Sequence, residues 1–276
     1  MRVLPNFIVV GAQRCGTTWL YDSLKSQQSV YLPLERKELH FFDDNFAKGI
    51  EWYENYYKNV NDETHIGDIT PKYMYDLSCA KKIRDTLGQV KIVIMLRNPV
   101  DRLVSHFGLA VRDRGYDPDG LNNFISNNPD AIERGMYYEQ VKNYYEVFGQ
   151  ENVYLIKFDD IRKNQRVVLD NLSKFLGFKY ESFTGKAKNN NDSYIPRWQW
   201  GYAKSKQLAD ALRRQGFDSL VESFKNSGFN KMFGRSNNKI AIDPKIKVEY
   251  QDVFKQDILN TMELTGLDLK DWLNKY

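Results

Sequence analysis

Short apolar segments rich in β-branched residues recur along the chain and predict the strands of a buried sheet. The clearest is Val90–Leu96, and Phe7–Val10 has the same character before it stops at Gly11. A third segment ends near Asp68, and Asn152–Phe158 is the fourth. Strands that are almost continuously apolar are typical of parallel sheets with both faces covered.

Between these strands, apolar residues recur at the spacing of amphipathic helices. The predicted helices cover residues 17–27, 49–60, 78–88, 100–115, 137–149, 165–178, 203–215 and 247–272, the last with a break at Gly266. Alternation of strands and helices favours an α/β fold: a P-loop-type central parallel β-sheet with helices on both faces, followed by a helical C-terminal tail. For 276 residues we expect a single domain over 1–276.

The loop after the first strand carries the first candidate chemistry. "GAQRCGTT", residues 11–18, approximates the phosphate loop G-x-x-x-x-G-K-[ST], but Thr17 stands at the lysine position and Arg14 lies inside the loop. Gly11 and Gly16 permit tight turns, and the amides that open the next helix can face an anion. The hydroxyls of Thr17 and Thr18 add donors. We therefore expect an oxyanion site here, rather than a plain glycine turn.

A second anion-binding group follows the strand at 90–96. This strand ends in Arg97, where nucleotide triphosphatases use a carboxylate to hold magnesium. A guanidinium offers a fork of donors that suits phosphate oxygens and repels a metal ion. Ligands of parallel sheets bind beyond the carboxyl ends of the strands. The sequence therefore suggests two neighbouring anion sites and no obvious magnesium site, so a nucleotide with phosphates at both ends of its ribose fits better than ATP.

Composition narrows the class of protein. The 40 basic and 36 acidic residues leave a net charge of +4, which argues against a strongly basic nucleic-acid binder and allows a local positive cleft. The two cysteines, Cys15 and Cys79, are too few for a disulfide framework or a zinc site. We see no signal peptide and no apolar run long enough to span a membrane, so a cytoplasmic protein is expected.

Taken together, the motifs resemble those of the sulfotransferases that use 3′-phosphoadenosine-5′-phosphosulfate (PAPS). "GAQRCGTTWL" resembles the 5′-phosphosulfate loop of this family, and "RNPVDRLVSHF" resembles its 3′-phosphate motif. "KELHFFD", residues 37–43, resembles the K-E-x-H-F-F segment of heparan-type and related bacterial enzymes. The similarity continues through "VYLIKFDDI" to the terminal "DLKDWL". It implies a PAPS-dependent sulfotransferase that acts on a hydroxyl of a carbohydrate or glycoconjugate and requires no metal.

The resemblance also implies roles for individual residues. Glu38 is implied as the general base, and His40 as the alternative base or as a residue that orients Glu38 or the acceptor. Arg14 is implied to stabilise charge on the leaving group, while Arg97 and Ser105 hold the 3′-phosphate. The residues implied to bind the cofactor are Arg14, Cys15, Gly16, Thr17, Thr18, Trp19, Arg97, Ser105, Lys186 and Lys188.

Several of these residues also have purely structural interpretations. Glu38 lies in the charged run "LERKELH" and is compatible with a surface carboxylate, Cys15 with a small residue that fills the loop, and Trp19 with a core residue.

A carboxylate that faces an aromatic wall has its pKa raised toward neutrality, and we expect this of Glu38. The family often has a lysine at the position of Ile69, whereas here Lys72 lies three residues further on.

Two other functions compete with sulfuryl transfer. The first is a nucleotide or small-molecule kinase built on the same loop, which the missing loop lysine and Arg97 disfavour. The second is a non-catalytic anion-binding protein, which Glu38 and His40 beside two phosphate motifs disfavour. Lipid, peptide and phenolic acceptors compete with a carbohydrate acceptor.

Overall fold

The computed structural model describes residues 2–181, 199–214, 221 and 242–276. The chain divides into two compact units. The first comprises Met1–Asn98, Met136–Asn190 and Gln256–Leu273, and the second comprises Pro99–Gly135, Asn191–Lys255 and Asn274–Tyr276. The sheet and both predicted strand-end loops belong to the first unit.

The sheet has five strands in the order β2-β3-β1-β4-β5, and every neighbouring pair is parallel. The strands are β1 (Phe7–Gly11), β2 (Val30–Tyr31), β3 (His65–Ile69), β4 (Lys91–Leu96) and β5 (Val153–Lys157). Ile8 pairs with Asp68 on one side and with Ile92 on the other. All of β1 is buried, because β1 is central and helices cover both faces. The four predicted strands are confirmed, and β2 is an additional short edge strand.

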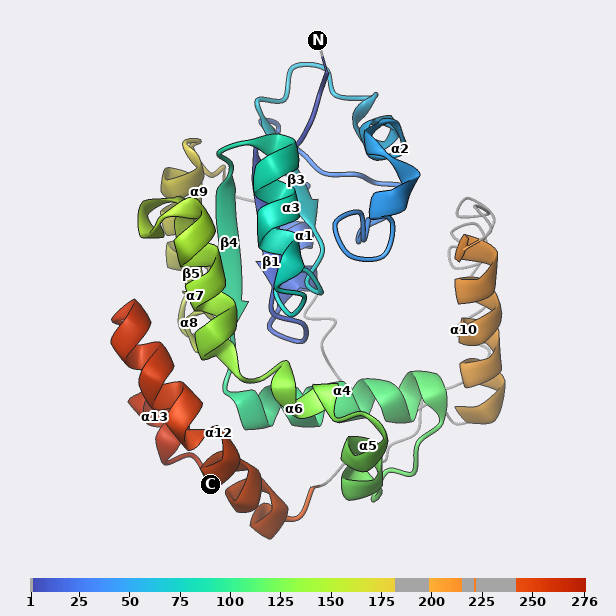
Figure 1. The fold of residues 1–276 in the computed structure, drawn as a ribbon, viewed down its shortest axis with the longest axis vertical. Coiled ribbons are helices and arrows are strands. Elements are labelled where there is room, and N and C mark those ends of the chain that lie inside the picture. Colours follow the sequence, from blue (N-terminus) through green and yellow to red (C-terminus); the bar gives the residue numbers. More distant parts are fainter. Residues whose placement is uncertain (1, 182–198, 215–220, 222–241) are drawn as a thin grey trace. The chain divides into compact units, whose positions relative to one another are not determined.

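Helices cover both faces of this sheet, as Figure 1 shows. There, α3 and α7 lie in front of the sheet, and α1 and α9 lie behind it. This distribution follows from the right-handed crossover of parallel strands, since β1 connects toward β2 whereas β3 and β4 connect in the opposite direction. The helices of this unit are α1 (Thr17–Leu24), α2 (Ile50–Glu54), α3 (Ser78–Leu87), α7 (Tyr137–Phe148), α8 (Phe158–Lys163), α9 (Gln165–Leu176) and α13 (Lys270–Leu273).

The strand order creates a reversal between β1 and β4. The chain leaves β1 toward one edge of the sheet and leaves β4 toward the other. The crevice beyond such a reversal is where open α/β sheets bind ligands. The loops that follow β1 and β4 carry Arg14 and Arg97, so the fold places both predicted anion-binding loops at this position.

Aromatic side chains form a buried layer beside β3. Phe41 stacks on Tyr53 with ring centroids 4.4 Å apart, and Phe42 meets Tyr73 edge-on at 5.5 Å. The segment predicted as one helix over 49–60 is instead α2 followed by a 3-10 turn, Asn55–Tyr57. Trp52 and Tyr53 of α2 stack on Phe41 and so belong to this layer.

The described residues of the second unit are mainly helical. It contains α4 (Pro99–Arg114), α5 (Leu121–Asn127), α6 (Asp130–Glu133), α10 (Gln199–Arg214) and the first part of α12 (Pro244–Thr265), whose remainder belongs to the first unit. Pro99 opens α4, where its missing N–H costs nothing because the amide at that position has no partner within a helix. The buried Arg102 of α4 donates to the Ala131 carbonyl of α6.

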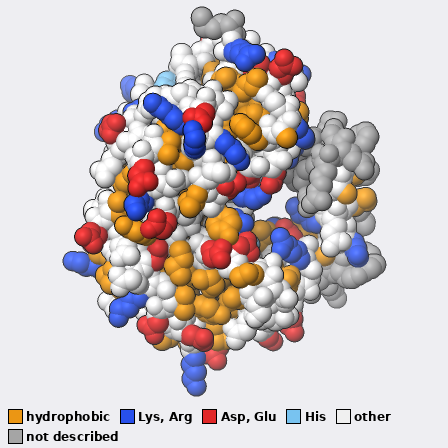
Figure 2. All heavy atoms as spheres, in the orientation of Figure 1, with side chains coloured by type: hydrophobic (Ala, Val, Ile, Leu, Met, Phe, Trp, Pro, Cys, Tyr) orange, Lys and Arg blue, Asp and Glu red, His pale blue; other side chains and the backbone are white. Residues whose placement is uncertain are grey.

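The surface carries mixed charge. On the face shown in Figure 2, lysine and arginine side chains alternate with aspartate and glutamate. Within the described part of the chain, no helix combines the length and hydropathy needed to cross a membrane.

Candidate active site

The loop after β1 is held against the sheet by two glycines that leave no room for a side chain. A Cβ on Gly11 would lie 2.4 Å from the Cβ of Met74, and one on Gly16 would lie 2.9 Å from the Phe158 ring. Gly16 also has a φ of +99°, which favours glycine. The Ala12 amide donates to the Met95 carbonyl at 2.8 Å. The loop backbone is therefore fixed directly before the first turn of α1.

The loops after β1 and β4 touch. Nη1 of Arg97 donates to the Arg14 carbonyl at 3.2 Å, and the Arg97 guanidinium lies 4.9 Å from the centroid of the Phe158 ring. The Tyr137 hydroxyl donates to the Arg97 carbonyl at 2.9 Å and lies 3.7 Å from Sγ of Cys15. The expected proximity of the two strand-end arginines is thus observed in the geometry. Nε of Arg97 is buried and has no hydrogen-bond partner among the described residues.

The other predicted loop residues are mostly inward-facing. Cys15, Thr17 and Trp19 are buried, and Nε1 of Trp19 finds no hydrogen-bond partner in the described parts of the chain. Thr18 is exposed on the first turn of α1 and accepts a hydrogen bond from Nζ of Lys37 at 2.7 Å. The α1 end of the loop is thereby joined to the segment that carries Glu38.

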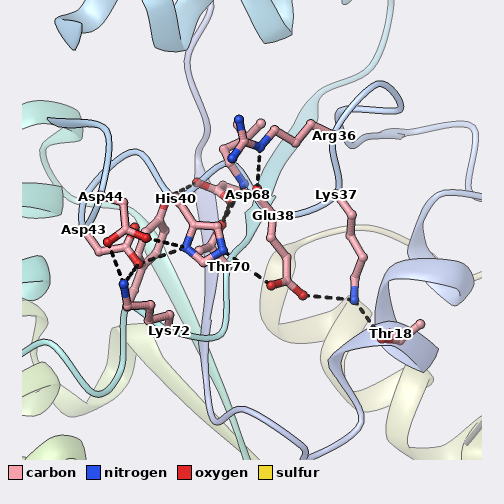
Figure 3. Close-up of polar contacts among 12 residues, drawn as sticks. Thr18, Arg36, Lys37, Glu38, His40, Asp43, Asp44, Asp68, Thr70 and Lys72 are labelled. Atoms are coloured by element: carbon pink, nitrogen blue, oxygen red, sulfur yellow. Dashed lines mark hydrogen bonds and ion pairs between the residues drawn. The ribbon is translucent and has the colours of Figure 1, made fainter. Parts of the chain in front are cut away.

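Figure 3 shows Glu38 in a chain of charged groups. Its Oε1 lies 3.4 Å from Nζ of Lys37, and its Oε2 lies 3.6 Å from Nε2 of His40. Nδ1 of His40 pairs with Oδ2 of Asp43 at 2.9 Å. The Glu38 side chain is half-buried, with 35% of its surface exposed.

Lys72 closes the far end of this chain. Its Nζ lies 2.6 Å from Oδ1 of Asp44 and 3.5 Å from Oδ2 of Asp43. His40, Asp43 and Asp44 offer potential ligand atoms within 4.8 Å of one another, a spacing compatible with a cation. The ammonium of Lys72 already contacts both of these carboxylates.

A buried carboxylate on β3 fixes the backbone of the Glu38 segment. Oδ1 of Asp68 accepts from the Thr70 hydroxyl at 2.7 Å, and Oγ1 of Thr70 accepts from the Leu39 amide at 3.2 Å. Oδ2 of Asp68 accepts from the Tyr73 hydroxyl at 3.0 Å, and that hydroxyl accepts from the Phe41 amide at 2.8 Å. Both relays end on residues that flank His40. They hold the segment in one register against the sheet.

Tyr53 completes the environment of this carboxylate. Its hydroxyl donates to Oδ2 of Asp68 at 2.8 Å. Burial raises the pKa of Asp68 to about 6, although three donated hydrogen bonds oppose the shift. Asp68 is therefore ionised at neutral pH and serves as an acceptor for all three hydroxyls.

The charges of the Glu38 chain set the protonation states within it. Burial raises the pKa of Glu38, but its hydrogen bond to His40 and the charges of Lys37 and His40 outweigh burial and hold the pKa below its usual value. The expected upward shift is therefore wrong, because the neighbours of Glu38 are cations rather than an aromatic wall. Burial lowers the pKa of His40, yet the bonds to Asp43 and Glu38 raise it to about 9. At neutral pH Glu38 is a carboxylate and His40 an imidazolium.

Two of the site residues have strained backbones. Among the described non-glycine residues, Arg14 and His40 are those with positive φ, at 71° and 53°. Such conformations cost on the order of 1 kcal/mol or more, and they concentrate at functional sites. The Asn45 amide and its side-chain Nδ2 both donate to the His40 carbonyl, which holds this conformation.

Three further implied residues belong to other parts of the chain. Ser105 lies on α4 in the second unit. Lys186 and Lys188 lie outside the described residues. Sequence reasoning gave no role to Asp68, Thr70 or the contact between Lys37 and Thr18. The sequence gives a weak indication of the role of Asp68, because a carboxylate at the end of an apolar strand needs hydrogen-bond donors when it is buried.

Comparison with known proteins adds an independent line of evidence. A family model described as "Sulfotransferase domain" matches residues 4–266. The membrane-associated sulfotransferase kil1 of Dictyostelium discoideum is 33% identical over 138 residues, covering 47% of this chain and 29% of that protein. The bifunctional heparan sulfate N-deacetylase/N-sulfotransferase 1 of Caenorhabditis briggsae is 28% identical over 196 residues, covering 63% of this chain and 22% of that protein. The chain thus spans less than a third of either relative.

A solved structure matches over almost the full length. The sulfotransferase of Alicyclobacillus acidocaldarius has a TM-score of 0.73 at 22% identity, covering 98% of this chain and 99% of that one. This likeness confirms the predicted fold class. Because the family model covers far more than half of the sequence, the chain belongs to the sulfotransferase domain family, as the motifs at residues 11–20, 37–43 and 97–107 predict.

Proposed function

We propose that this protein is a PAPS-dependent sulfotransferase that acts on a hydroxyl of a carbohydrate or glycoconjugate, with Glu38 as general base. One observation carries the proposal: the ionised carboxylate of Glu38 is joined through Lys37 to the first turn of α1, directly after the phosphate-type loop. The proposed acceptor site and the proposed donor site are therefore adjacent. The sulfotransferase family membership supports transfer of a sulfuryl rather than a phosphoryl group.

The residues around the loop fit a nucleotide with two phosphates. Gly11 and Gly16 let the loop pack closely against Met74 and Phe158 directly before α1, and the buried Nε of Arg97 retains a donor without a protein partner among the described residues. We assign the 5′-phosphosulfate to the loop from Arg14 to Trp19, and the 3′-phosphate to Arg97 and Ser105. Lys186 and Lys188 remain proposed cofactor-binding residues. When bound, PAPS supplies the sulfuryl group and a phosphate leaving group.

The ion chain supports Glu38 as the group that accepts the proton of the acceptor hydroxyl. A general base must be unprotonated and within reach of the hydroxyl. Glu38 meets the first condition at neutral pH and its side chain is partly exposed, whereas the protonated state of His40 disfavours it as the base. His40 instead donates toward Glu38 and Asp43, which orients the carboxylate. Arg14 and the hydroxyls of Thr17 and Thr18 would stabilise charge on the loop side of the reaction.

The proposed carbohydrate class of acceptor is supported by a relative and by the motif at residues 37–43. The Caenorhabditis briggsae relative is named for heparan sulfate, and the segment 37–43 resembles that of heparan-type enzymes. The same proposal includes a small-molecule or glycan acceptor and no nucleic-acid partner. It also includes a single domain over 1–276 and a cytoplasmic location.

The proposal is tested by ligand-induced thermal stabilisation. Adenosine 3′,5′-bisphosphate should raise the melting temperature of the wild type by mass action, and Arg97→Ala should remove most of this rise. Arg162→Ala is the matched control, because its guanidinium also stacks on Phe158, at 5.3 Å, but belongs to α8. That variant should keep the full shift.

The transfer itself is then measured with PAPS and a panel of glycans by mass spectrometry. Glu38→Gln should bind the bisphosphate like the wild type and lose at least about 100-fold in transfer rate. Stabilisation by ATP with magnesium and not by the bisphosphate would contradict the proposal and favour the kinase alternative. Nucleotide binding without transfer to any acceptor would favour a non-catalytic protein.

A further inference from the structure

We propose that the ammonium of Lys37 binds the sulfuryl group of the donor and distinguishes PAPS from the product nucleotide that lacks this group. The inference rests on the proposed function and deepens it. It starts from the position of a single nitrogen atom, Nζ of Lys37, which contacts the α1 side of the loop and the proposed base simultaneously.

The geometry places this ammonium between donor and acceptor. Nζ of Lys37 lies 2.7 Å from Oγ1 of Thr18 and 3.4 Å from Oε1 of Glu38. Dashed lines in Figure 3 mark both contacts. Thr18 is the second residue of α1, so its hydroxyl marks the helix end where the loop presents its amides to an anion. Glu38 marks the position of the acceptor hydroxyl. A sulfuryl group transferred from the loop to that hydroxyl would lie close to Nζ of Lys37.

The bonding capacity of Lys37 leaves room for this contact. An ammonium has three donors, and the structure records two hydrogen-bonding contacts, to Thr18 and Glu38, among the described residues. The side chain is 26% exposed, and its stem runs near Tyr21, with Nζ 6.0 Å from the ring centroid. The cation is therefore held in place but remains open to a ligand.

Charge balance singles out Lys37 over the other lysine of the cluster. Lys72 contacts the two carboxylates of Asp43 and Asp44, so its charge is compensated twice. Lys37 faces one carboxylate and one neutral hydroxyl. A sulfuryl group carries negative charge on its oxygens, and a fixed cation stabilises such charge where water is excluded. Lys37 is the better placed of the two to supply it.

The test compares two nucleotides that differ by the sulfuryl group. Dissociation constants for PAPS, without acceptor, and for adenosine 3′,5′-bisphosphate are measured by calorimetry on the wild type, Lys37→Met and Lys37→Arg. We expect Lys37→Met to weaken PAPS binding at least tenfold and bisphosphate binding by less than twofold. Lys37→Arg should recover most of the PAPS affinity. Lys25→Met is the control, because Lys25 also lies over the Tyr21 ring, at 5.3 Å, but pairs with Asp22.

A second readout reports the contact with Glu38. Lys37 helps to hold the Glu38 pKa down, so Lys37→Met should move the acid limb of kcat/KM to higher pH. Equal weakening of both nucleotides, or no weakening of either, would overturn the assignment of Lys37 to the sulfuryl group. A wild type that binds neither nucleotide would instead overturn the proposed function. If Lys37→Met does not fold, the same comparison is made with Lys37→Gln, which keeps a polar side chain without the charge.

Discussion

The imidazole of His40 lies between two carboxylates, and its protonation decides the chemistry of the cluster. With His40 protonated, Lys37, His40 and Lys72 balance Glu38, Asp43 and Asp44 in charge. Loss of the His40 proton would leave one uncompensated negative charge beside the base. An extra negative charge at this position opposes the approach of an anionic donor.

The pH dependence of transfer tests these protonation states. Because the pKa of His40 is about 9 and that of Glu38 is below its usual value, kcat/KM should be flat near neutrality and fall as pH rises through about 9. Rates measured from pH 5 to 10.5 give the limb directly, and His40→Asn should lack it. A rate that rises through pH 9 would show instead that neutral His40 is the base.

β3 and the turn that follows it act as a support for the segment that carries Glu38. Asp68 is the acceptor at the centre. The hydroxyls of Thr70 and Tyr73 donate to its carboxylate and accept hydrogen bonds from two backbone amides. A hydrogen bond to a charged group is stronger than a neutral one, so the relay stiffens the segment. Displacement of reacting groups by about 1 Å can cost on the order of 100-fold in rate.

This support predicts different outcomes for two hydroxyl deletions around Asp68. Thr70→Val breaks the link from Asp68 to the Leu39 amide and should lower kcat about 10- to 100-fold with a small change in nucleotide affinity. Tyr53→Phe removes a similar bond to Asp68 that does not continue to the segment, and it should keep kcat within about threefold. Equal kcat values for both variants, at matched stability by urea unfolding, would contradict a positioning role for Thr70.

The end of the chain takes part in the core of the first unit. Trp272 of α13 is 1% exposed, and its Nε1 donates to Oδ2 of Asp159 at 2.9 Å. Its carbonyl accepts from Nδ2 of Asn98, the residue after Arg97. The C-terminal helix therefore packs beside the end of β4, where one of the proposed anion sites lies.

Removal of the Trp272 side chain should destabilise the whole protein. Trp272→Ala should lower the free energy of unfolding by about 3–5 kcal/mol, because a large buried ring leaves a cavity. Leu259→Ala on α12 is the control, since Leu259 is 39% exposed and its truncation should destabilise the protein clearly less than that of Trp272. Denaturant unfolding measures both, and a Trp272→Ala variant as stable as the control would refute the packing role.

The fold was predictable from local patterns along the chain. Apolar strands and amphipathic helices are periodic signals over a few residues, and Gly11 and Arg97 stand directly at strand ends. Their position at the carboxyl ends of parallel strands follows from the alternation of strands and helices, whereas the order of the strands is seen only in the structure. The sequence by itself therefore determined the α/β architecture, the sulfotransferase family and the two candidate anion loops.

The tertiary structure decided the protonation of Glu38 and the position of the segment that carries it. The pKa of Glu38 lies below its usual value, not above it, because Lys37 and His40 turn toward it. The anchoring of its segment depends on Asp68 and Thr70, about 30 residues away along the chain. The protonation of a side chain and the register of a segment depend on neighbours in space. Charged groups interact over a few ångströms whatever their separation in the sequence. No local pattern encodes those contacts, so only the folded chain shows that the proposed base, Glu38, is paired with two cations.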